Sequence, residues 1–217
     1  LPLKEGKYNW SHQSSVSVFD STIVKINTNK DIFGFGEVCT LGPAYLPAYP
    51  EGVRAGIKKI GNSLLGMDPT NLSEINIQMD RNLKGHNYVK SSIDMACWDI
   101  LGKYTKQPLW KMLGGKFGNE VKLYRAISQE SSKEMSKKVK KYKKEGYSKF
   151  QLKVGGNPDE DIERIKLVRS ILDKKDVLVA DANTGWLMHD ALNVINGIKE
   201  LDVYVEQPCI SYNENLS

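Results

Sequence analysis

Polar residues follow short apolar runs at a regular spacing in the second half of the sequence. Lys153 closes "KFQLK", Asp181 closes "VLVAD" and Glu206 closes "VYVE". The first two are 28 positions apart and the last two are 25 apart. That spacing matches one strand plus one helix of a parallel sheet, so we expect all three residues at the same ends of successive strands. Active sites of parallel sheets form at this carboxyl edge.

These residue types predict a particular chemistry. Two carboxylates on adjacent strand ends repel each other, and burying even one without compensation costs several kcal/mol. A divalent cation resolves this repulsion, and hard oxygen ligands favour Mg²⁺ or Mn²⁺, so Asp181 and Glu206 are candidate metal ligands. A cation beside a partly buried lysine favours the neutral amine, which can accept a proton. Lys153 and a metal could therefore remove a proton α to a substrate carboxylate.

Each of these residues also has an ordinary structural explanation. A lone Asp at a strand end, such as Asp181 before "NTGW", is often only a helix N-cap. Gln151 could be a packed polar residue, and Lys149, at the opposite end of its strand, is expected to be a solvated lysine. The repetition of the same polar edge on three strands is what favours a functional site.

The second part of the chain alternates strand and helix patterns, which is typical of a parallel α/β sheet. A proline and a run of acidic residues at 158–161 are helix start signals. The expected strands are 121–128, 149–155, 177–183 and 203–209, with helices over 131–146, from 157 onward, and over 186–201. From spacing alone this is either a small open sheet or part of a longer barrel protein.

The first part predicts an α+β domain over residues 1–115, with the α/β part over 116–217. β-Branched residues at 15–29 and "DIFGFGEV" at 31–38 indicate an antiparallel hairpin. The run "SSIDMACWDILGKY" (91–104) places apolar residues three and four positions apart, as in a buried helix face. Glycines in "KMLGGKFG" (111–118) are suited to a domain boundary.

Composition excludes several classes of function. The net charge of +5 comes largely from lysines in 131–146, which we interpret as the solvated face of an amphipathic helix. No basic patch is interleaved with aromatics and no apolar run is long enough to span a bilayer, so neither nucleic-acid binding nor membrane insertion is expected. Cys39, Cys97 and Cys209 are odd in number and widely spaced, which favours reduced thiols in a cytoplasmic protein.

Several of these motifs together resemble the enolase superfamily, in its mandelate racemase and muconate-lactonizing branch. The similarity rests on "GFGEV", "SSIDMACWDILGK", "LGG" and "QLKVGG…VADAN…VEQP". It implies an N-terminal capping domain followed by the first half of a (β/α)₇β TIM-like barrel, a Mg²⁺ or Mn²⁺ cofactor, and a homo-oligomer. It also implies that the chain is part of a longer protein, because the third acidic ligand and a second lysine come from later strands.

The resemblance assigns a role to each matching residue. Lys153 corresponds to the second lysine of the K-x-K motif, the base on one substrate face. Asp181 and Glu206 correspond to the first two metal ligands, and Asn183 to a polar position beside them. The first lysine of K-x-K is replaced by Gln151, which can hydrogen-bond to substrate but carries no charge.

A Q-x-K strand, with "GPAYLPAY" and "GHNYVKSSIDMA", is most similar to epimerases of hydroxyproline betaine and related proline derivatives. A quaternary ammonium would be repelled by an extra lysine and attracted to aromatic faces, for which Tyr45, Tyr49 and Trp10 are candidates. Ordinary packing is the alternative for these rings.

The resemblance predicts a metal-dependent racemase or epimerase that acts on a small-molecule carboxylate through an enolate. Two alternatives remain. One is a dehydratase, in which the same enolate of a hydroxyproline or sugar acid expels a β-hydroxyl. The other is a non-catalytic paralogue on the same scaffold.

Overall fold

The structure is a computed structural model that describes residues 2–4 and 6–216. It divides into two compact units, one formed mainly by residues 18–120 and the other by residues 3–17 together with 121–217. The sequence predicts one domain over 1–115, whereas the structure groups residues 3–17 with the second unit. The reason is direct pairing: Gln129 N donates to Asn9 O at 3.0 Å, and Asn9 N donates to Ser128 Oγ at 2.7 Å.

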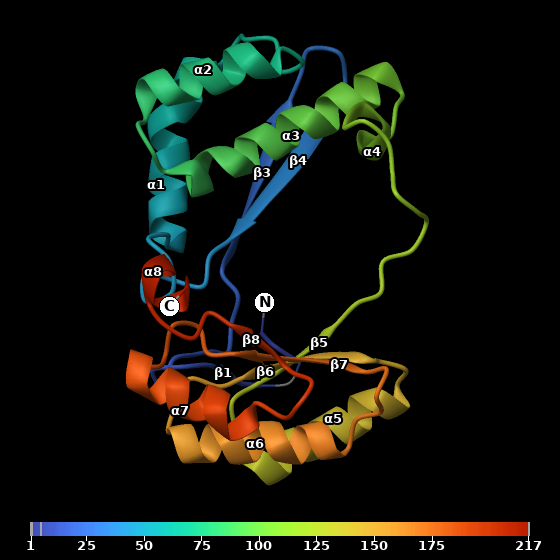
Figure 1. Cartoon of the computed structure of the whole chain (residues 1–217). Helices are drawn as coiled ribbons and strands as arrows, with labels where there is room; N and C mark the ends of the chain where they lie inside the picture. The colour runs from blue at the N-terminus through green and yellow to red at the C-terminus, as the bar shows by residue number, and fades with distance from the viewer. Residues whose placement is uncertain (1, 5, 217) are drawn as a thin grey trace. The chain divides into compact units, whose positions relative to one another are not determined.

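The first unit is an antiparallel hairpin packed on helices (Figure 1). The hairpin predicted from the sequence is confirmed, with Ser21 opposite Cys39 and Asn27 opposite Phe33. Its elements are β3 (Ser21–Asn27), β4 (Phe33–Cys39), α1 (Pro50–Gly61), the 3₁₀ helix η1 (Asn62–Leu64), α2 (Leu72–Asn82), α3 (Asn87–Thr105) and α4 (Leu109–Met112).

Strand β4 lies directly on the backbone of α3. A Cβ added at Gly36 would lie 1.8 Å from Ser92 O, so only glycine allows this approach. The apolar face predicted for the helix contributes Ile93 and Cys97 to the core of this unit, where they pack with Ile60 of α1 and Met79 of α2.

The second unit contains a four-stranded parallel sheet in the order β5-β6-β7-β8. A two-residue antiparallel pair near the N-terminus, β1 and β2, belongs to the same unit. Its elements are β1 (Tyr8–Asn9), β2 (Ser15–Val16), β5 (Arg125–Ile127), α5 (Ser132–Lys144), β6 (Lys149–Lys153), α6 (Pro158–Ser170), β7 (Val177–Asp181), α7 (Met188–Ile198), β8 (Tyr204–Glu206) and α8 (Tyr212–Leu216).

The alternation of strand and helix predicted from the sequence is confirmed, although the outer strands are shorter than expected. β5 is limited to the three residues that pair with Phe150–Leu152 of β6. β8 ends at Glu206 because Gln207 adopts a left-handed backbone, with φ of 44°, and Pro208 has no N–H to donate.

One face of this sheet is covered by α5, α6 and α7 (Figure 1). Phe150 and Leu152 are 1% and 0% exposed and belong to a core that includes Val139 of α5 and Ile165 of α6. Phe150 and Leu152 therefore face the helices, as alternate residues of one strand do. The opposite face of β6 is left with Gln151 and Lys153, the residues of chemical interest.

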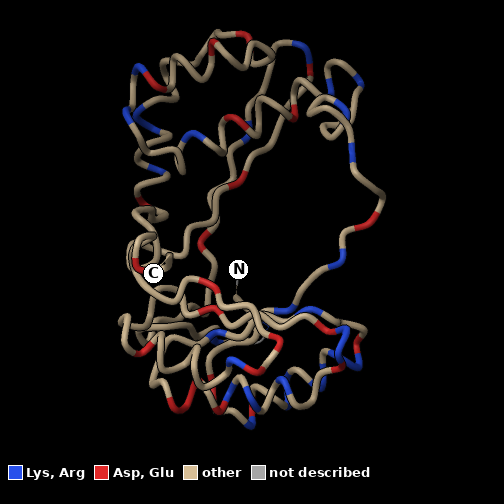
Figure 2. The backbone as a smooth tube through the Cα atoms, in the orientation of Figure 1, with Lys and Arg blue, Asp and Glu red and all other residues tan. Residues whose placement is uncertain are grey.

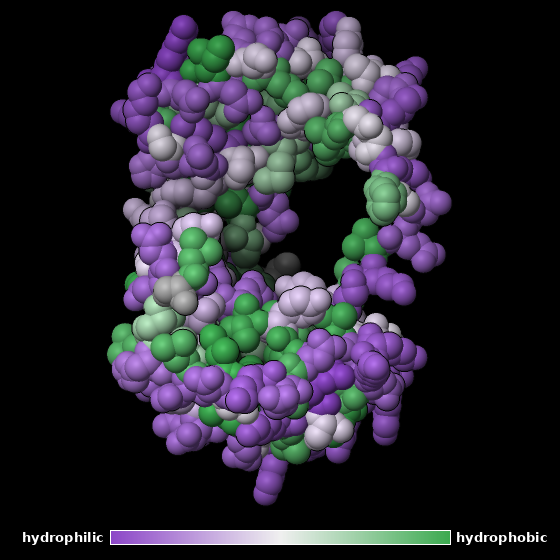
Figure 3. Space-filling view, in the orientation of Figure 1, coloured by the Kyte–Doolittle hydropathy of each residue, from purple (hydrophilic) through white to green (hydrophobic). Residues whose placement is uncertain are grey.

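Helices α5 and α6 begin where the sequence signals predict. The Ser131 side chain accepts a hydrogen bond from Glu134 N, and Asn157 accepts from Asp159 N and Glu160 N. Basic residues recur along α5 (Figure 2), and the outer surface of the helical layer is mostly hydrophilic (Figure 3). Among the described residues, no helix has both the length and the apolar character needed to cross a membrane.

Candidate metal and acid–base site

The register of the parallel strands brings the predicted chemical residues into one row. Lys153 lies opposite Asp181 across β6 and β7, and Asp181 lies opposite Glu206 across β7 and β8. The backbone pairing continues beyond this row, because Val154 N donates to Asp181 O at 2.9 Å. All three residues therefore stand at the carboxyl edge of the sheet, as the spacing predicts.

Asp181 is the centre of this row. It is 1% exposed and forms an ion pair with Lys153, which is 7% exposed. Its Oδ2 also accepts from Gln151 Nε2 at 3.0 Å and from Asn183 Nδ2 at 3.1 Å, while Oδ1 accepts from Asn183 N at 2.9 Å. The buried carboxylate thus accepts from one ammonium and from amide donors, which offsets the cost of its desolvation, and its Oδ1 has a single donor among the described residues.

Gln151 joins the two predicted metal ligands. Its Nε2 donates to Asp181 Oδ2 at 3.0 Å and to Glu206 Oε2 at 2.8 Å. One nitrogen within hydrogen-bond reach of both carboxylates means that their oxygens converge on a common point. Gln151 has no charge, so Lys153 is the basic residue of this row.

The donor set fits a hard divalent cation. Two carboxylates converge, and Asn183 Oδ1 is buried without a hydrogen-bond donor among the described residues. Carboxylate and amide oxygens are the ligands that Mg²⁺ prefers. Within residues 2–4 and 6–216, no cluster of three or more Asp, Glu, His or Cys side chains is arranged for a metal, so the candidate ligands are these two carboxylates and the Asn183 amide oxygen.

The loops that carry these residues have unusual backbone conformations. Asn183, Thr184 and Gln207 adopt positive φ angles of 44°, 64° and 44°, which are uncommon for residues other than glycine. The two loops are joined by a hydrogen bond from Thr184 N to Gln207 O at 2.8 Å, and Asn183 Nδ2 donates to Gln207 Oε1 at 3.4 Å. Strained residues of this kind cluster at functional sites. Gln207 was not predicted, because nothing in the sequence distinguishes it from a loop residue.

The aromatic candidates differ in their surroundings. Trp10 belongs to the second unit and is 6% exposed, with its ring tilted against Tyr8 at a centroid distance of 6.2 Å. The next residue, Ser11, donates from Oγ to Asn183 O at 3.2 Å, so this segment reaches the site loop. Tyr45 belongs to the first unit and is 38% exposed, and its contact with substrate stays a prediction.

Lys149 lies where the sequence predicts, whereas Asp161 is more deeply buried than its sequence context indicates. Lys149 is exposed at the amino end of β6, as predicted for a solvated lysine. Asp161 was expected only as one of the acidic residues that start α6, yet it is 0% exposed and bonded to the loops after β6 and β7. No local sequence signal separates it from its exposed neighbours Asp159 and Glu160.

Family models match both parts of the chain. Residues 10–114 match the mandelate racemase / muconate lactonizing enzyme N-terminal domain, and residues 134–217 match the enolase C-terminal domain-like family. The chain belongs to the enolase superfamily, in its mandelate racemase and muconate-lactonizing branch.

Relatives within this superfamily include both lyases and isomerases. The chain is 54% identical to the cis-3-hydroxy-L-proline dehydratase of Roseibium aggregatum. The alignment covers the whole of this chain and 59% of that protein. It is 29% identical to the N-succinyl-L-Arg/Lys racemase of Bacillus cereus, and that alignment covers 91% of this chain and 54% of the racemase.

Solved structures of the superfamily have the same fold. A mandelate racemase/muconate lactonizing enzyme from Roseovarius nubinhibens matches with a TM-score of 0.93 at 36% identity, covering 99% of this chain and 57% of that one. Another from the same organism, complexed with magnesium, matches with a TM-score of 0.92 at 31% identity, covering 99% and 59%. The chain therefore spans somewhat more than half the length of these superfamily members.

Proposed function

We propose that the protein is a divalent-metal-dependent enzyme that removes the proton α to the carboxylate of a proline derivative. The observation that carries the proposal is the row of Lys153, Asp181 and Glu206 at one sheet edge, with Gln151 in contact with both carboxylates. A buried amine beside converging carboxylates is a suitable arrangement of base and metal ligands.

In this proposal Lys153 accepts the α-proton. Its low exposure keeps bulk water away, so that the proton is held at Nζ and can be returned to carbon or passed to a leaving group. Asp181 and Glu206 would hold Mg²⁺, which when bound stabilises the negative charge that develops on the substrate carboxylate. Asn183 fixes the Asp181 carboxylate through two hydrogen bonds.

Gln151 favours a substrate that itself carries a positive charge. A lysine at this position would place a second cation beside Lys153, whereas the amide contributes only hydrogen bonds. The ring nitrogen of a proline derivative, fully charged in a betaine, would then approach without repulsion from residue 151. Contact of that cation with the face of Trp10, which is in the same unit as Gln151, is part of the same proposal, and Tyr45 stays a candidate from the sequence.

The same enolate leads to two reactions. Returning the proton on the opposite face epimerises the carbon, whereas expelling a β-hydroxyl dehydrates the substrate. The dehydratase relative at 54% identity favours dehydration of a 3-hydroxyproline, and the racemase relative supports epimerisation of substrates without that hydroxyl. The proposed compartment is the cytoplasm, which the three free cysteines support.

Proton exchange in D₂O tests the proposal and separates the two reactions. The complete protein is incubated with Mg²⁺ and either cis-3-hydroxyproline, 4-hydroxyproline betaine or proline betaine, and the Cα–H signal is followed by NMR. Metal-dependent loss of this signal is expected for at least one compound. Loss of water from the 3-hydroxy compound would identify a dehydratase, and deuterium at an inverted centre with the hydroxyl retained would identify an epimerase.

The absence of exchange with every compound would overturn the proposal, provided that calorimetry shows Mg²⁺ to be bound. That result would favour a non-catalytic binding protein on the same scaffold.

A further inference from the structure

A fully buried carboxylate lies outside the proposed metal and base residues. Asp161, in the first turn of α6, is 0% exposed. Its Oδ2 accepts from Gly155 N at 3.0 Å, from Gly156 N at 2.8 Å and from Trp186 Nε1 at 3.0 Å. The two glycines lie in the loop that follows Lys153, and Trp186 lies in the loop that follows β7. One oxygen therefore connects two loops of the candidate site.

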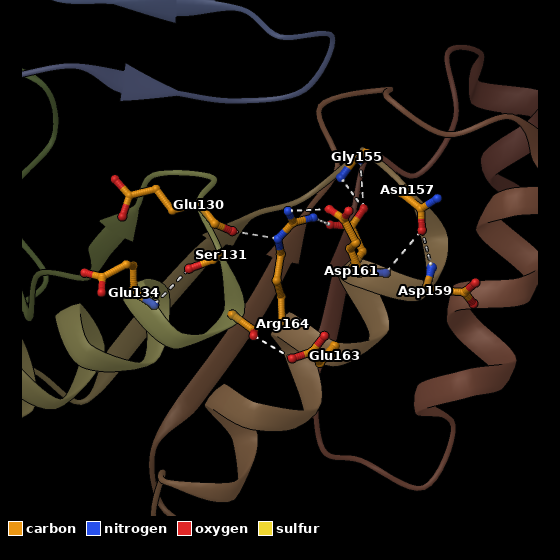
Figure 4. Close-up of polar contacts among 12 residues, drawn as sticks. Glu130, Ser131, Glu134, Gly155, Asn157, Asp159, Asp161, Glu163 and Arg164 are labelled. Atoms are coloured by element: carbon orange, nitrogen blue, oxygen red, sulfur yellow. Dashed lines mark hydrogen bonds and ion pairs between the residues drawn. The ribbon is translucent and has the colours of Figure 1, made fainter.

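A third loop is joined through Arg164. Its Nη1 donates to Asp161 Oδ1 at 2.7 Å, and its Nε donates to Glu130 O, in the loop after β5, at 2.7 Å. Figure 4 shows the guanidinium between the Glu130 carbonyl and the Asp161 carboxylate, with the Gly155 amide on the far side of that carboxylate. Asp161 and Arg164 thus connect the carboxyl-end loops of β5, β6 and β7.

These contacts are not needed to cap the helix. The Asn157 side chain already accepts from Asp159 N and Glu160 N, which are donors of the first turn. All three donors to Asp161 Oδ2 instead come from outside α6. Burial of a charged residue at this position is costly unless every acceptor is satisfied, so the arrangement points to a requirement of the loops rather than of the helix.

The connected loops are packed at backbone distance. Gly155 has a φ of 94°, and a Cβ added to it would lie 2.3 Å from Ala182 O. Ala182 directly follows Asp181, and Gly155 is two residues after Lys153. A displacement of either loop would consequently change the position of the lysine relative to the carboxylate with which it pairs.

We propose that Asp161, together with Arg164, is a positioning residue that holds Lys153 in place against Asp181 during proton transfer. The inference deepens the proposed function and rests on it. Asp161 reaches the base only through the loops, so its loss affects the rate of proton transfer more than substrate binding. Displacements of about 1 Å in catalytic groups cost on the order of 100-fold in rate.

The substitution Asp161→Asn tests this inference with little change in volume. Both carboxylate oxygens act as acceptors, so the asparagine NH₂ must face either the loop donors or Arg164, and one set of hydrogen bonds is lost. Asp159→Asn is the matched control, because it removes the same charge from an exposed side chain in the same helical turn. Arg164→Lys is a second variant that keeps the charge but cannot connect Asp161 and Glu130 with the same planar group.

The first measurement is the steady-state rate of Cα–H exchange with Mg²⁺ bound. For Asp161→Asn we expect kcat to fall about 10- to 100-fold with KM within about threefold of the wild type, and for Arg164→Lys a smaller fall of the same kind. Asp159→Asn should stay within about twofold. A kcat for Asp161→Asn within threefold of the wild type, or a loss explained entirely by the unfolded fraction, would overturn the proposal.

Amide hydrogen exchange gives a readout that is independent of activity. The Gly155 and Gly156 amides and the segment 182–186 should exchange at least about tenfold faster in Asp161→Asn, while helix α3 is unchanged. Unchanged exchange in these loops would show that Asp161 does not hold them. If the wild type failed to exchange any substrate proton, the proposed function would fall while this measurement still decided whether Asp161 connects the loops.

Discussion

At the scale of single residues, Gln151 sets this chain apart from the K-x-K pattern that its superfamily resemblance implies. Its amide nitrogen lies 3.0 Å from Asp181 Oδ2 and 2.8 Å from Glu206 Oε2. A lysine ammonium at this point would add a full charge to an edge where Lys153 is already buried. Under the proposed function, we therefore expect the identity of residue 151 to affect how well the site accepts a cationic substrate.

The substitution Gln151→Lys should reduce the preference for quaternary-ammonium substrates. The ammonium of the new lysine and the quaternary ammonium of a bound substrate, at about 7 Å from each other in a partly buried site, would repel by about 1–2 kcal/mol. That repulsion corresponds to roughly tenfold weaker binding. We expect KM for proline betaine to rise about tenfold more than KM for N-acetylproline, which has the same ring without the charge. Equal changes in KM for the two compounds would contradict this reading of Gln151.

The positions of individual residues were predictable to different extents. Lys153, Asp181 and Glu206 could be found because a polar residue recurs at the end of three successive strands, at the spacing of one strand plus one helix. Asp161 could not, since its burial depends on donors from Gly155 and Trp186, which approach it only in the folded unit. The same is true of Ser11, which contacts Asn183 across a separation of 172 residues.

At the scale of secondary-structure elements, ion pairs connect helix α5 to the turn that precedes β7. Lys143 Nζ lies 2.8 Å from Asp176 Oδ2 and 3.0 Å from Asp173 Oδ2. Burial acts to raise the pKa of Asp176, but the hydrogen bond from Lys143, the Asp173 backbone N–H and the nearby lysine charges outweigh it, leaving this pKa below its ordinary value. The ion pair therefore stabilises the start of the strand that carries Asp181.

We expect Asp176→Asn to lower the free energy of unfolding by about 1–3 kcal/mol at pH 7, because the buried partner of Lys143 loses its charge. A lowered pKa in the folded state means that the stabilisation is present at neutral pH and is lost as the pH falls through that pKa. The difference between variant and wild type should therefore shrink below about pH 4. Urea unfolding of both proteins at pH 7 and at pH 3 measures this difference in the free energy of unfolding.

Asp173→Asn is the matched control for this prediction. It removes a carboxylate with the same lysine partner, but its side chain is 62% exposed, whereas that of Asp176 is 2% exposed. An exposed pair contributes less than about 1 kcal/mol. A pH-independent loss in Asp176→Asn, or an equal loss in both variants, would show that the buried ion pair is not what fastens α5 to this turn.

Most elements of the second unit were predictable because strand and helix periods alternate clearly between residues 121 and 206. Short elements were not. β1 and β2 have two residues each, and the interaction of their segment with the loop after β5 depends on pairs such as Asn9 and Ser128, separated by 119 positions. Local pattern contains no information on contacts of this kind, which is why the sequence predicts only the boundary near residue 115, whereas the structure also groups residues 3–17 with the second unit.

At the scale of the whole molecule, the chain combines a hairpin-and-helix unit with a four-stranded parallel sheet whose carboxyl edge carries the chemical residues. It covers 59% of the dehydratase relative and 57–59% of the matching solved structures. The third acidic ligand and the second lysine implied by the superfamily are not among the residues of this row. Measurements of activity therefore belong on the complete protein.

The proposed function depends above all on Lys153 as the base, and a pair of lysine variants tests this role. Lys153→Ala and Lys149→Ala remove the same side chain from opposite ends of β6, one buried beside Asp181 and one exposed. The rate of Cα–H exchange in D₂O is measured for each with Mg²⁺ binding confirmed by calorimetry. We predict a loss of about 100- to 10,000-fold for Lys153→Ala, with metal binding retained, and a change within about twofold for Lys149→Ala. Exchange within tenfold of the wild type in Lys153→Ala, or an equal loss in Lys149→Ala, would contradict the assignment.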